Sequence, residues 1–167
     1  MRHLRWLVVG LTAVAFTILI PEGALGGPPY QPDVFVRGAV GEGVHNATGA
    51  GQFKRLRLRP DRAKIVPYWN RNDGANPDTF FYWGCAGTGP FRVKWRDWQG
   101  TNVTAQVVAG TFSTAQLGPG WSEGMLSLRV KARRSAGEGD VLRCGVLAIS
   151  WGDGTQDQAG YRVVVTA

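Results

Sequence analysis

The residues with the widest chemical repertoire in this chain are its two cysteines, Cys85 and Cys144. A thiol can act as a nucleophile, bind zinc or form a disulfide. A closed zinc site needs four ligands, and beyond residue 26 only His45 could join the two sulfurs. The cysteines lie 59 positions apart, and in an exported protein they are expected to pair. We therefore predict a Cys85–Cys144 disulfide that clamps two packed sheets and stabilises the fold by roughly 4 kcal/mol.

Three arginines alternate with leucines along one segment: Arg55, Arg57 and Arg59 are separated by Leu56 and Leu58. In an extended strand, side chains two positions apart share a face at a spacing of about 7 Å. Guanidinium groups bind phosphate and carboxylate in bidentate fashion, so this row could hold an anionic polymer. Alternatively, the arginines solvate the outer face of an edge strand and protect that edge from pairing with a neighbour.

Tryptophan is abundant, with seven copies in 167 residues. Exposed aromatic rings stack on sugars or nucleobases, or anchor protein interfaces. Trp69, Trp95 and Trp98 stand in or near strand ends and turns, and Trp83 ends a run of four aromatic residues, so these four form a candidate contact surface. The alternative is structural: an aromatic-rich strand is buried on one side and covered on the other by a loop or by the N-terminal segment.

Few residues suggest metal binding or catalysis. Asp73 and Asp78 lie in a stretch rich in oxygen ligands, but calcium needs about six to eight of them, and the glutamate that closes an EF-hand loop is absent. The spacing fits Asx turns at least as well, so calcium is a minor alternative and no cofactor is expected. No nucleophile elbow, HExxH motif or phosphate loop accompanies His45. The pattern favours a protein that is not an enzyme, with a small secreted hydrolase as a remote alternative.

The first 26 residues have the pattern of a cleaved signal peptide: a basic start, an apolar stretch from Trp6 to Ile20, and small residues before a predicted cleavage ahead of Gly27. The apolar stretch has 15 residues, whereas a membrane-spanning helix needs roughly 20. The remaining 141 residues carry 17 basic and 11 acidic side chains, a formal charge of +6. That balance favours weak attraction to anionic polymers and identifies none of them. The protein is expected in the periplasm, at the cell surface or outside the cell.

Short apolar alternations separated by turn residues follow from residue 52 onward, a pattern typical of antiparallel strands with one buried face. Residues 27–51 form a predicted arm rich in glycine and proline, with one possible strand at Asp33–Arg37 that could pair within the domain or with a neighbour. No segment shows a helical stripe. The strands expected in the domain of residues 52–167 are Phe53–Arg59, Lys64–Arg71, Thr79–Trp83, Phe91–Trp95, Val103–Val108, Met125–Ala132, Val141–Ser150 and Gly160–Thr166.

This organisation predicts an all-β, antiparallel β-sandwich of about seven to nine strands with one inter-strand disulfide. Seven short motifs also follow one another along the chain: Tyr30-Gln-Pro-Asp33, Thr48-Gly-Ala-Gly-Gln52, Asn72-Asp-Gly74, Asp78-Thr-Phe80 with Gly84, Asn102-Val-Thr-Ala105, Leu117-Gly-Pro-Gly120 and Leu126-Ser-Leu-Arg-Val130. In this order they resemble a β-sandwich repeat module of large secreted bacterial surface proteins, here in a single copy. The resemblance implies an immunoglobulin-like, extracytoplasmic, non-enzymatic module and supplies no catalytic residues.

Taken together, these patterns predict a secreted, non-catalytic interaction or surface-structural module of the cell envelope. Its partner would be another protein or a second copy of the chain. The alternative is a module that binds a glycan or an anionic envelope polymer through exposed tryptophans and the arginine row. Neither specific nucleic-acid binding nor membrane insertion after signal cleavage is expected.

Overall fold

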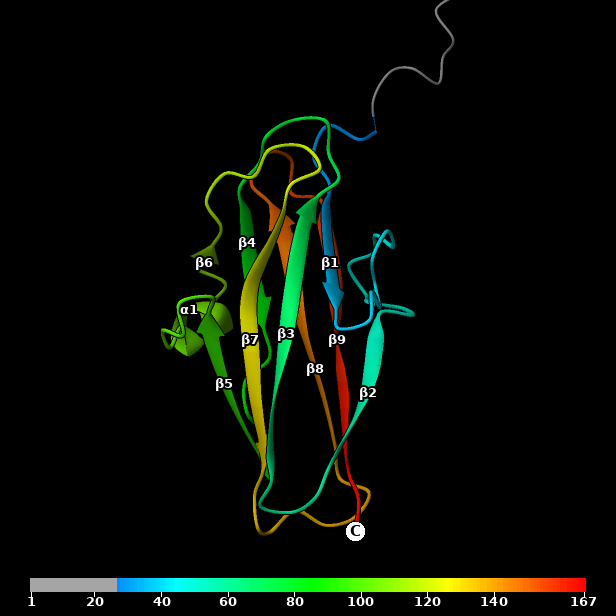
Figure 1. The fold of residues 1–167 in the computed structure, drawn as a ribbon, viewed down its shortest axis with the longest axis vertical. Coiled ribbons are helices and arrows are strands. Elements are labelled where there is room, and N and C mark those ends of the chain that lie inside the picture. Colours follow the sequence, from blue (N-terminus) through cyan, green and yellow to red (C-terminus); the bar gives the residue numbers. More distant parts are fainter. Residues whose placement is uncertain (1–26) are drawn as a thin grey trace, which may run out of the picture.

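The computed structural model describes residues 27–167 as two β-sheets packed face to face (Figure 1). The predicted signal peptide, residues 1–26, lies outside the described residues. No helix within residues 27–167 combines the length and apolarity required to cross a bilayer. The elements in chain order are β1 (Pro32–Val36), β2 (Phe53–Leu58), β3 (Ala63–Asn72), β4 (Phe80–Gly84), β5 (Phe91–Asp97), α1 (Thr104–Ala109), β6 (Phe112–Ser113), β7 (Ser122–Ala132), β8 (Val141–Ser150) and β9 (Gln156–Val165).

The strand order defines the fold. One sheet has four strands in the order β1-β3-β7-β5, and the other has five in the order β2-β9-β8-β4-β6. All paired strands are antiparallel except β2 and β9, which are parallel. With β1, β3, β4, β5, β7, β8 and β9 taken as strands A to G, the sheets are A-B-E-D and G-F-C, which is the immunoglobulin arrangement. The predicted immunoglobulin-like sandwich of seven to nine strands is confirmed.

Aromatic side chains from both sheets fill the space between them. Tyr68 of β3 has its ring centroid 5.3 Å from that of Trp95 of β5 and 5.6 Å from that of Tyr161 of β9. All three side chains are almost completely buried. Because each aromatic side chain removes roughly 150–250 Å² from water, this cluster dominates the contact between the sheets.

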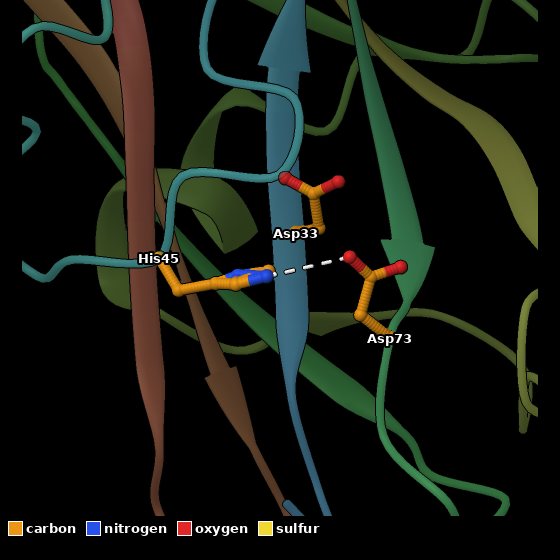
Figure 2. A group of neighbouring side chains, drawn as sticks. All are labelled: Asp33, His45 and Asp73. Carbon is orange, nitrogen blue, oxygen red and sulfur yellow. Dashed lines mark ion pairs between the residues drawn. The ribbon is translucent and has the colours of Figure 1, made fainter. Parts of the chain in front are cut away.

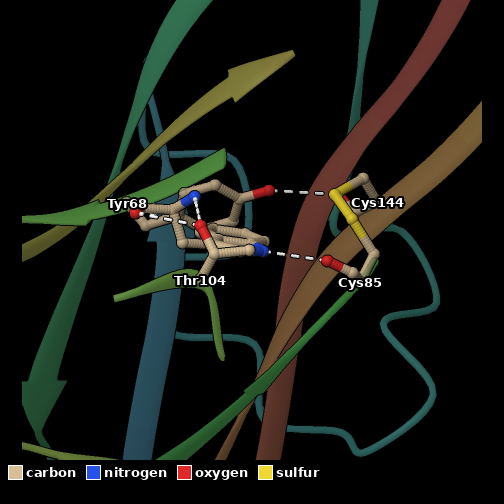
Figure 3. Close-up of a disulfide and its surroundings, with 5 residues drawn as sticks. Tyr68, Cys85, Thr104 and Cys144 are labelled. Atoms are coloured by element: carbon tan, nitrogen blue, oxygen red, sulfur yellow. Dashed lines mark hydrogen bonds between the residues drawn. A yellow bond between two sulfur atoms is a disulfide. The ribbon is translucent and has the colours of Figure 1, made fainter. Parts of the chain in front are cut away.

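The predicted Cys85–Cys144 disulfide is confirmed, with the two Cα atoms 5.2 Å apart. It does not clamp the two sheets, as the sequence suggested, because Cys85 directly follows β4, and β4 pairs with β8, which carries Cys144, in the five-stranded sheet. Side chains of the opposite sheet complete the cross-link (Figure 3): the Tyr68 hydroxyl donates to the carbonyl of Cys144 at 3.0 Å, and the Trp95 Nε1–H donates to that of Cys85 at 2.9 Å. The disulfide therefore fixes neighbouring strands, and two buried aromatic residues attach them to the other sheet.

The N-terminal arm pairs within its own sandwich, which answers the question that the sequence left open. β1 lies antiparallel to β3 at the edge of the four-stranded sheet. Buried Asp157 of β9 connects the arm to the other sheet, since its carboxylate accepts hydrogen bonds from the backbone N–H groups of Val34 at 2.6 Å and Asn46 at 2.9 Å. The arm therefore contributes β1 to the four-stranded sheet, and the chain then continues into β2 of the other sheet.

The segment Val103–Val108 was predicted to be a strand, and this prediction was wrong, because the segment forms most of helix α1. β-Branched residues favour strands in general. Here Val103 and Val107 are buried while Ala105 between them is exposed, whereas a strand would place all three side chains on one face. Gly110 ends the helix in the left-handed conformation at φ 73°. The other predicted strands are present, with ends that shift by at most four residues.

Candidate binding surface

The outer face of the five-stranded sheet carries the arginines that the sequence singled out on β2. Arg55 and Arg57 are exposed, and Leu56 and Leu58 between them point toward the interior. Arg59 is also exposed but lies just beyond the end of the strand. The alternation follows from the two-residue period of a strand whose other face is buried.

The register of the sheet places Arg55 in a second row that runs across three strands, and this cross-strand row of Arg55, Arg162 and Arg143 is called the arginine row from here on. Arg55 lies opposite Arg162 of β9, and Arg162 lies opposite Arg143 of β8. All three side chains are exposed. Neighbouring strands are about 4.8 Å apart, so the three arginine side chains project from adjacent positions on one face of the sheet. None of the three forms an ion pair within residues 27–167.

Two glycines and Phe53 form the next row of this face, directly beside the arginines. Phe53, Gly160 and Gly145 are opposite one another on β2, β9 and β8. The Phe53 ring lies over both glycines, because a Cβ atom on Gly160 would come within 2.7 Å of the ring and one on Gly145 within 2.9 Å. The Arg143 guanidinium stacks over that ring, 3.9 Å from its centroid. The aromatic ring thus holds Arg143 in a defined position at the sheet surface.

A hollow of about 350 Å³ opens next to these glycines. Trp83 of β4, Leu147 of β8 and Gln158 of β9 are opposite one another in the sheet and line it together with Phe53 and Arg143. The Trp83 side chain is 57% exposed. The outer face therefore presents three successive rows: an aromatic and polar row, a glycine row covered by Phe53, and the arginine row.

The four tryptophans of the predicted contact surface do not lie together. The prediction that Trp95 belongs to a contact surface was wrong. Its side chain is fully buried between the sheets and donates a hydrogen bond to the Cys85 carbonyl, so it cannot contact a partner. Trp69 is half-buried on the four-stranded sheet and stacks on Phe35, with the ring centroids 6.0 Å apart. Trp98 is 70% exposed and lines a cavity of about 250 Å³ at the end of β5. Of the four, only Trp83 stands on the same face as the arginine row.

Sequence reasoning missed a second basic surface, on the outer face of the four-stranded sheet. Arg92 and Lys94 of β5 lie opposite Lys131 and Arg129 of β7. The alternation of Arg92, Lys94 and Arg96 along one segment was the signal that could have revealed it. This surface is partly neutralised, because the Lys131 ammonium forms an ion pair with Asp61 at 2.6 Å. It therefore offers a matched comparison for the arginine row.

Acidic residues gather around one guanidinium at the arm. Figure 2 shows Asp33, His45 and Asp73 pointing toward one another, with His45 Nε2 3.3 Å from an Asp73 oxygen. Arg71 donates to Asp33 and to Glu42 at 2.8 Å each, and it also bonds Asp73. These three acids raise the pKa of Arg71, chiefly through Asp73. Although Asp33, His45 and Asp73 have the donor atoms for a metal, the guanidinium already supplies the positive charge, so the cluster fastens the loop after β1 to β3.

The two carboxylates considered for calcium belong to different hydrogen-bond networks. Asp73 pairs with Arg71 and His45. Asp78 is buried and accepts hydrogen bonds from the Ser150 hydroxyl and from the backbone N–H of Gly152 at 3.2 Å. Both carboxylates thus hold loops in place, and the Asx turn in this segment is made by Asn72, whose Oδ1 accepts a hydrogen bond from the Gly74 N–H at 2.9 Å.

The buried Asp33 carboxyl makes folding sensitive to pH. Burial raises its pKa from 3.8 to about 6, and the Gly43 N–H and Arg71 oppose this rise only in part. Since the folded protein then holds the proton more tightly than the unfolded chain, Asp33 stabilises the fold less and less as the pH rises from about 4 to about 6. Replacing Asp33 with Asn should remove this contribution, so the unfolding free energy of the variant should fall less steeply over that range.

Denaturant unfolding of the wild type and of Asp33→Asn at pH 4, 5, 6 and 7 measures the difference. Other carboxyl groups, including Asp157 and Glu123, whose pKa values are also raised by burial, are present in both proteins and cancel. Parallel stability curves for the two proteins would show that Asp33 titrates at its ordinary pKa.

Comparison with known proteins gives similarity at the level of structure alone. No family model matches the chain, and no curated protein matches it. A FixG-related protein from Vibrio parahaemolyticus is 10% identical, with a TM-score of 0.44 over 84% of this chain and 100% of that one. The VesB protease of Vibrio cholerae is 16% identical, with a TM-score of 0.42 over 70% of this chain and 30% of that one. The major pilin subunit BcpA of Bacillus cereus is 13% identical, with a TM-score of 0.42 over 81% of this chain and 40% of that one.

These three proteins include a protease and a pilin, and the TM-scores lie below 0.5. The chain spans less than a third of VesB and less than half of BcpA. The similarities therefore assign neither a family nor a function to this chain, and its fold class rests on the strand order described above.

Proposed function

We propose that this protein is a non-catalytic binding module that works outside the cytoplasm and holds an anionic polymer on the outer face of its five-stranded sheet. The observation that carries the proposal is the cross-strand row of Arg55, Arg162 and Arg143. Two further features support the setting: both thiols form a disulfide, which is typical of oxidising compartments, and the sequence begins with a predicted export signal.

The arginine row is unfavourable for folding on its own. Like charges directly opposite one another on neighbouring strands destabilise a sheet, by up to about 1 kcal/mol per pair. Arg162 faces an arginine on each side, and no acidic side chain pairs with any of the three within residues 27–167. An external chain of phosphates or carboxylates would neutralise the row and accept bidentate hydrogen bonds from it. We take this unbalanced charge as the mark of a binding function.

The side chains with catalytic potential support a non-enzymatic role. The two cysteines are joined in the disulfide, and the Asp33, His45 and Asp73 group is bound to Arg71. These residues serve to hold the fold together, which leaves the arginine face as the best-supported functional surface.

Protein–protein assembly, the leading interpretation from the sequence, has less support from the surface. Large exposed apolar side chains mark interfaces when they form a continuous patch. Here each one comes from a different strand or loop: Val44, Ile65, Trp83, Trp98, Trp121, Val141 and Trp151. On the five-stranded sheet, the exposed Trp83 and the Trp151–Phe81 pair lie away from the row of Arg55, Arg162 and Arg143, and that row fits a polyanion better than a protein surface.

A charge-matched pair of variants tests the proposal. Replacing Arg55, Arg143 and Arg162 with Gln should weaken binding to long-chain polyphosphate by roughly tenfold or more at 50 mM salt, and it should reduce the salt dependence by about two to three ion contacts. The fold should be no less stable, because repulsion across the sheet is relieved. Affinity is measured by titration at several salt concentrations, and stability by thermal melting.

The control variant removes the same charge from the other basic surface, by replacing Arg92, Arg96 and Arg129 with Gln. It should lower polyphosphate affinity much less than the first triple variant does. Equal losses in the two variants would mean that net charge alone attracts the polymer, and the proposed site would have to be abandoned.

A further inference from the structure

The arginine row does not stand alone on its face, and the hollow beside it suggests what kind of polymer binds there. The Trp83–Leu147–Gln158 row and the Arg55–Arg162–Arg143 row are four residues apart along β8, with the glycine row between them. At about 3.3 Å per residue, the two rows are separated by roughly 13 Å. A single extended ligand can therefore contact both rows.

Trp83 is placed as a platform rather than as a core residue. More than half of its side chain is exposed, although the residues before and after it in β4, Tyr82 and Gly84, are buried. One side of the indole rests against the turn after α1, where a Cβ atom on Gly110 would lie 3.8 Å from Trp83 Cγ. The turn supports the ring, and the hollow of about 350 Å³ leaves room beside it for a ligand.

Gly145 and Gly160 leave room for the Phe53 ring between the two rows. Side chains at these two positions would meet the Phe53 ring and, at position 160, the Cys144 carbonyl oxygen at 2.5 Å. The hollow between Trp83 and Arg143 is therefore lined by the Phe53 ring and Leu147, which make it partly apolar. Such a surface suits a ligand with flat apolar faces, polar edges and regularly spaced negative charges.

We infer that the polymer is an acidic polysaccharide, with one sugar ring stacked on Trp83 and its acidic groups bound by Arg143, Arg162 and Arg55. This inference rests on the proposed function and adds the chemical class of the ligand. The C–H face of a pyranose ring is apolar and packs on the negative face of an indole. The side-chain NH2 group of Gln158 faces the carbonyls of Ala47 and Thr48, and its amide oxygen can accept a hydrogen bond from a sugar hydroxyl.

Single-stranded nucleic acid shares two of these chemical features, since bases stack and phosphates bind arginine. Proteins that bind it use several aromatic rings for successive bases. Beside the arginine and glycine rows, Trp83 is the large exposed aromatic residue among those described, because the exposed Trp151 packs on Phe81 beyond the end of β8 that is far from Arg143, and the Phe53 ring is covered by the Arg143 guanidinium. The disulfide also favours an oxidising compartment outside the cytoplasm, and so away from intracellular nucleic acids.

The experiment uses three probes with the purified protein: oligogalacturonate, long-chain polyphosphate and oligo-dT. Replacing Trp83 with Ala should weaken oligogalacturonate binding roughly three- to tenfold and change polyphosphate binding by less than twofold. Trp83→Phe should recover most of the affinity, because it restores an aromatic platform. Trp98→Ala, which removes a tryptophan that is also more than half exposed but lies elsewhere, should leave all three affinities unchanged.

The probes separate failure of this inference from failure of the proposed function. If polyphosphate binding depends on the arginine row but Trp83→Ala leaves oligogalacturonate binding intact, the sugar-stacking inference is wrong and the proposed function stands. A loss confined to oligo-dT would replace the polysaccharide with single-stranded nucleic acid. If the wild type binds none of the probes, both proposals fail. Thermal melting of each variant confirms that its fold is retained.

Discussion

Replacing Trp95 with Ala is expected to lower the free energy of unfolding by about 3–5 kcal/mol, the range found when a large buried aromatic residue is truncated. Trp95 is fully buried between the sheets and packs against Tyr68 of its own four-stranded sheet. Its loss would leave a cavity between the sheets, and the Cys85 carbonyl would lose the indole N–H that donates to it. Both effects act on the contact that holds the disulfide-linked strands to the other sheet.

Trp98, three positions further along the chain, provides the matched control. Its side chain is 70% exposed, so Trp98→Ala should change the unfolding free energy by no more than about 0.5 kcal/mol. Denaturant unfolding followed by far-ultraviolet circular dichroism measures both variants without relying on tryptophan fluorescence. Similar small effects of the two substitutions would place Trp95 outside the core and contradict the packing described above.

Replacing Cys85 with Ser is expected to destabilise the oxidised protein by about 4 kcal/mol in the chain-entropy model, because the disulfide closes a loop between residues 59 positions apart. The effect should be large even though the bond joins adjacent strands, since its main consequence is on the unfolded chain. Cys144 is fully buried, so the freed thiol stays packed in the folded state. The measurement is the melting temperature of both proteins under non-reducing conditions.

The same substitution has an internal control in the wild type treated with reductant. Reduction should lower the melting temperature of the wild type toward that of Cys85→Ser, and it should leave the variant unchanged. A wild type that melts at the same temperature with and without reductant would show that the bond adds no stability.

Much of the fold could be predicted because the two-residue period of a half-buried strand appears in the sequence as alternating apolar and polar residues. Leu56 and Leu58 alternate with arginines, and β3 buries Val66 and Tyr68 on alternate positions. The segment that forms α1 could not be assigned in this way, because its β-branched residues match a strand. What makes it helical is the burial of Val107 against Gly84 of β4, a contact between residues far apart in sequence.

The candidate surface was only half predictable, since it depends on the register between strands. Arg55 could be recognised within its own segment, but Arg143 and Arg162 are isolated cations in sequence and become its neighbours only when β2, β9 and β8 pair. Trp95 and Trp98 flank the same dipeptide, and nothing local reveals which one the sandwich encloses. Trp83 gained its interpretation in the same way, from the glycines that two other strands bring beside it.

The parallel pairing of β2 with β9 has a mechanical consequence. The start of the described chain and the C-terminus lie at opposite ends of the sandwich (Figure 1). Once β1 has separated from β3, a pulling force applied to these two ends would load the six paired positions of β2 and β9 in shear, all at once, rather than unzip them one by one. The disulfide would also prevent the 59-residue separation between Cys85 and Cys144 from extending, which withholds about 200 Å of contour length at roughly 3.4 Å per residue. Under tension, the β2–β9 pairing would thus resist separation as a unit, and the disulfide would limit the length of chain that is released after the sheets unfold.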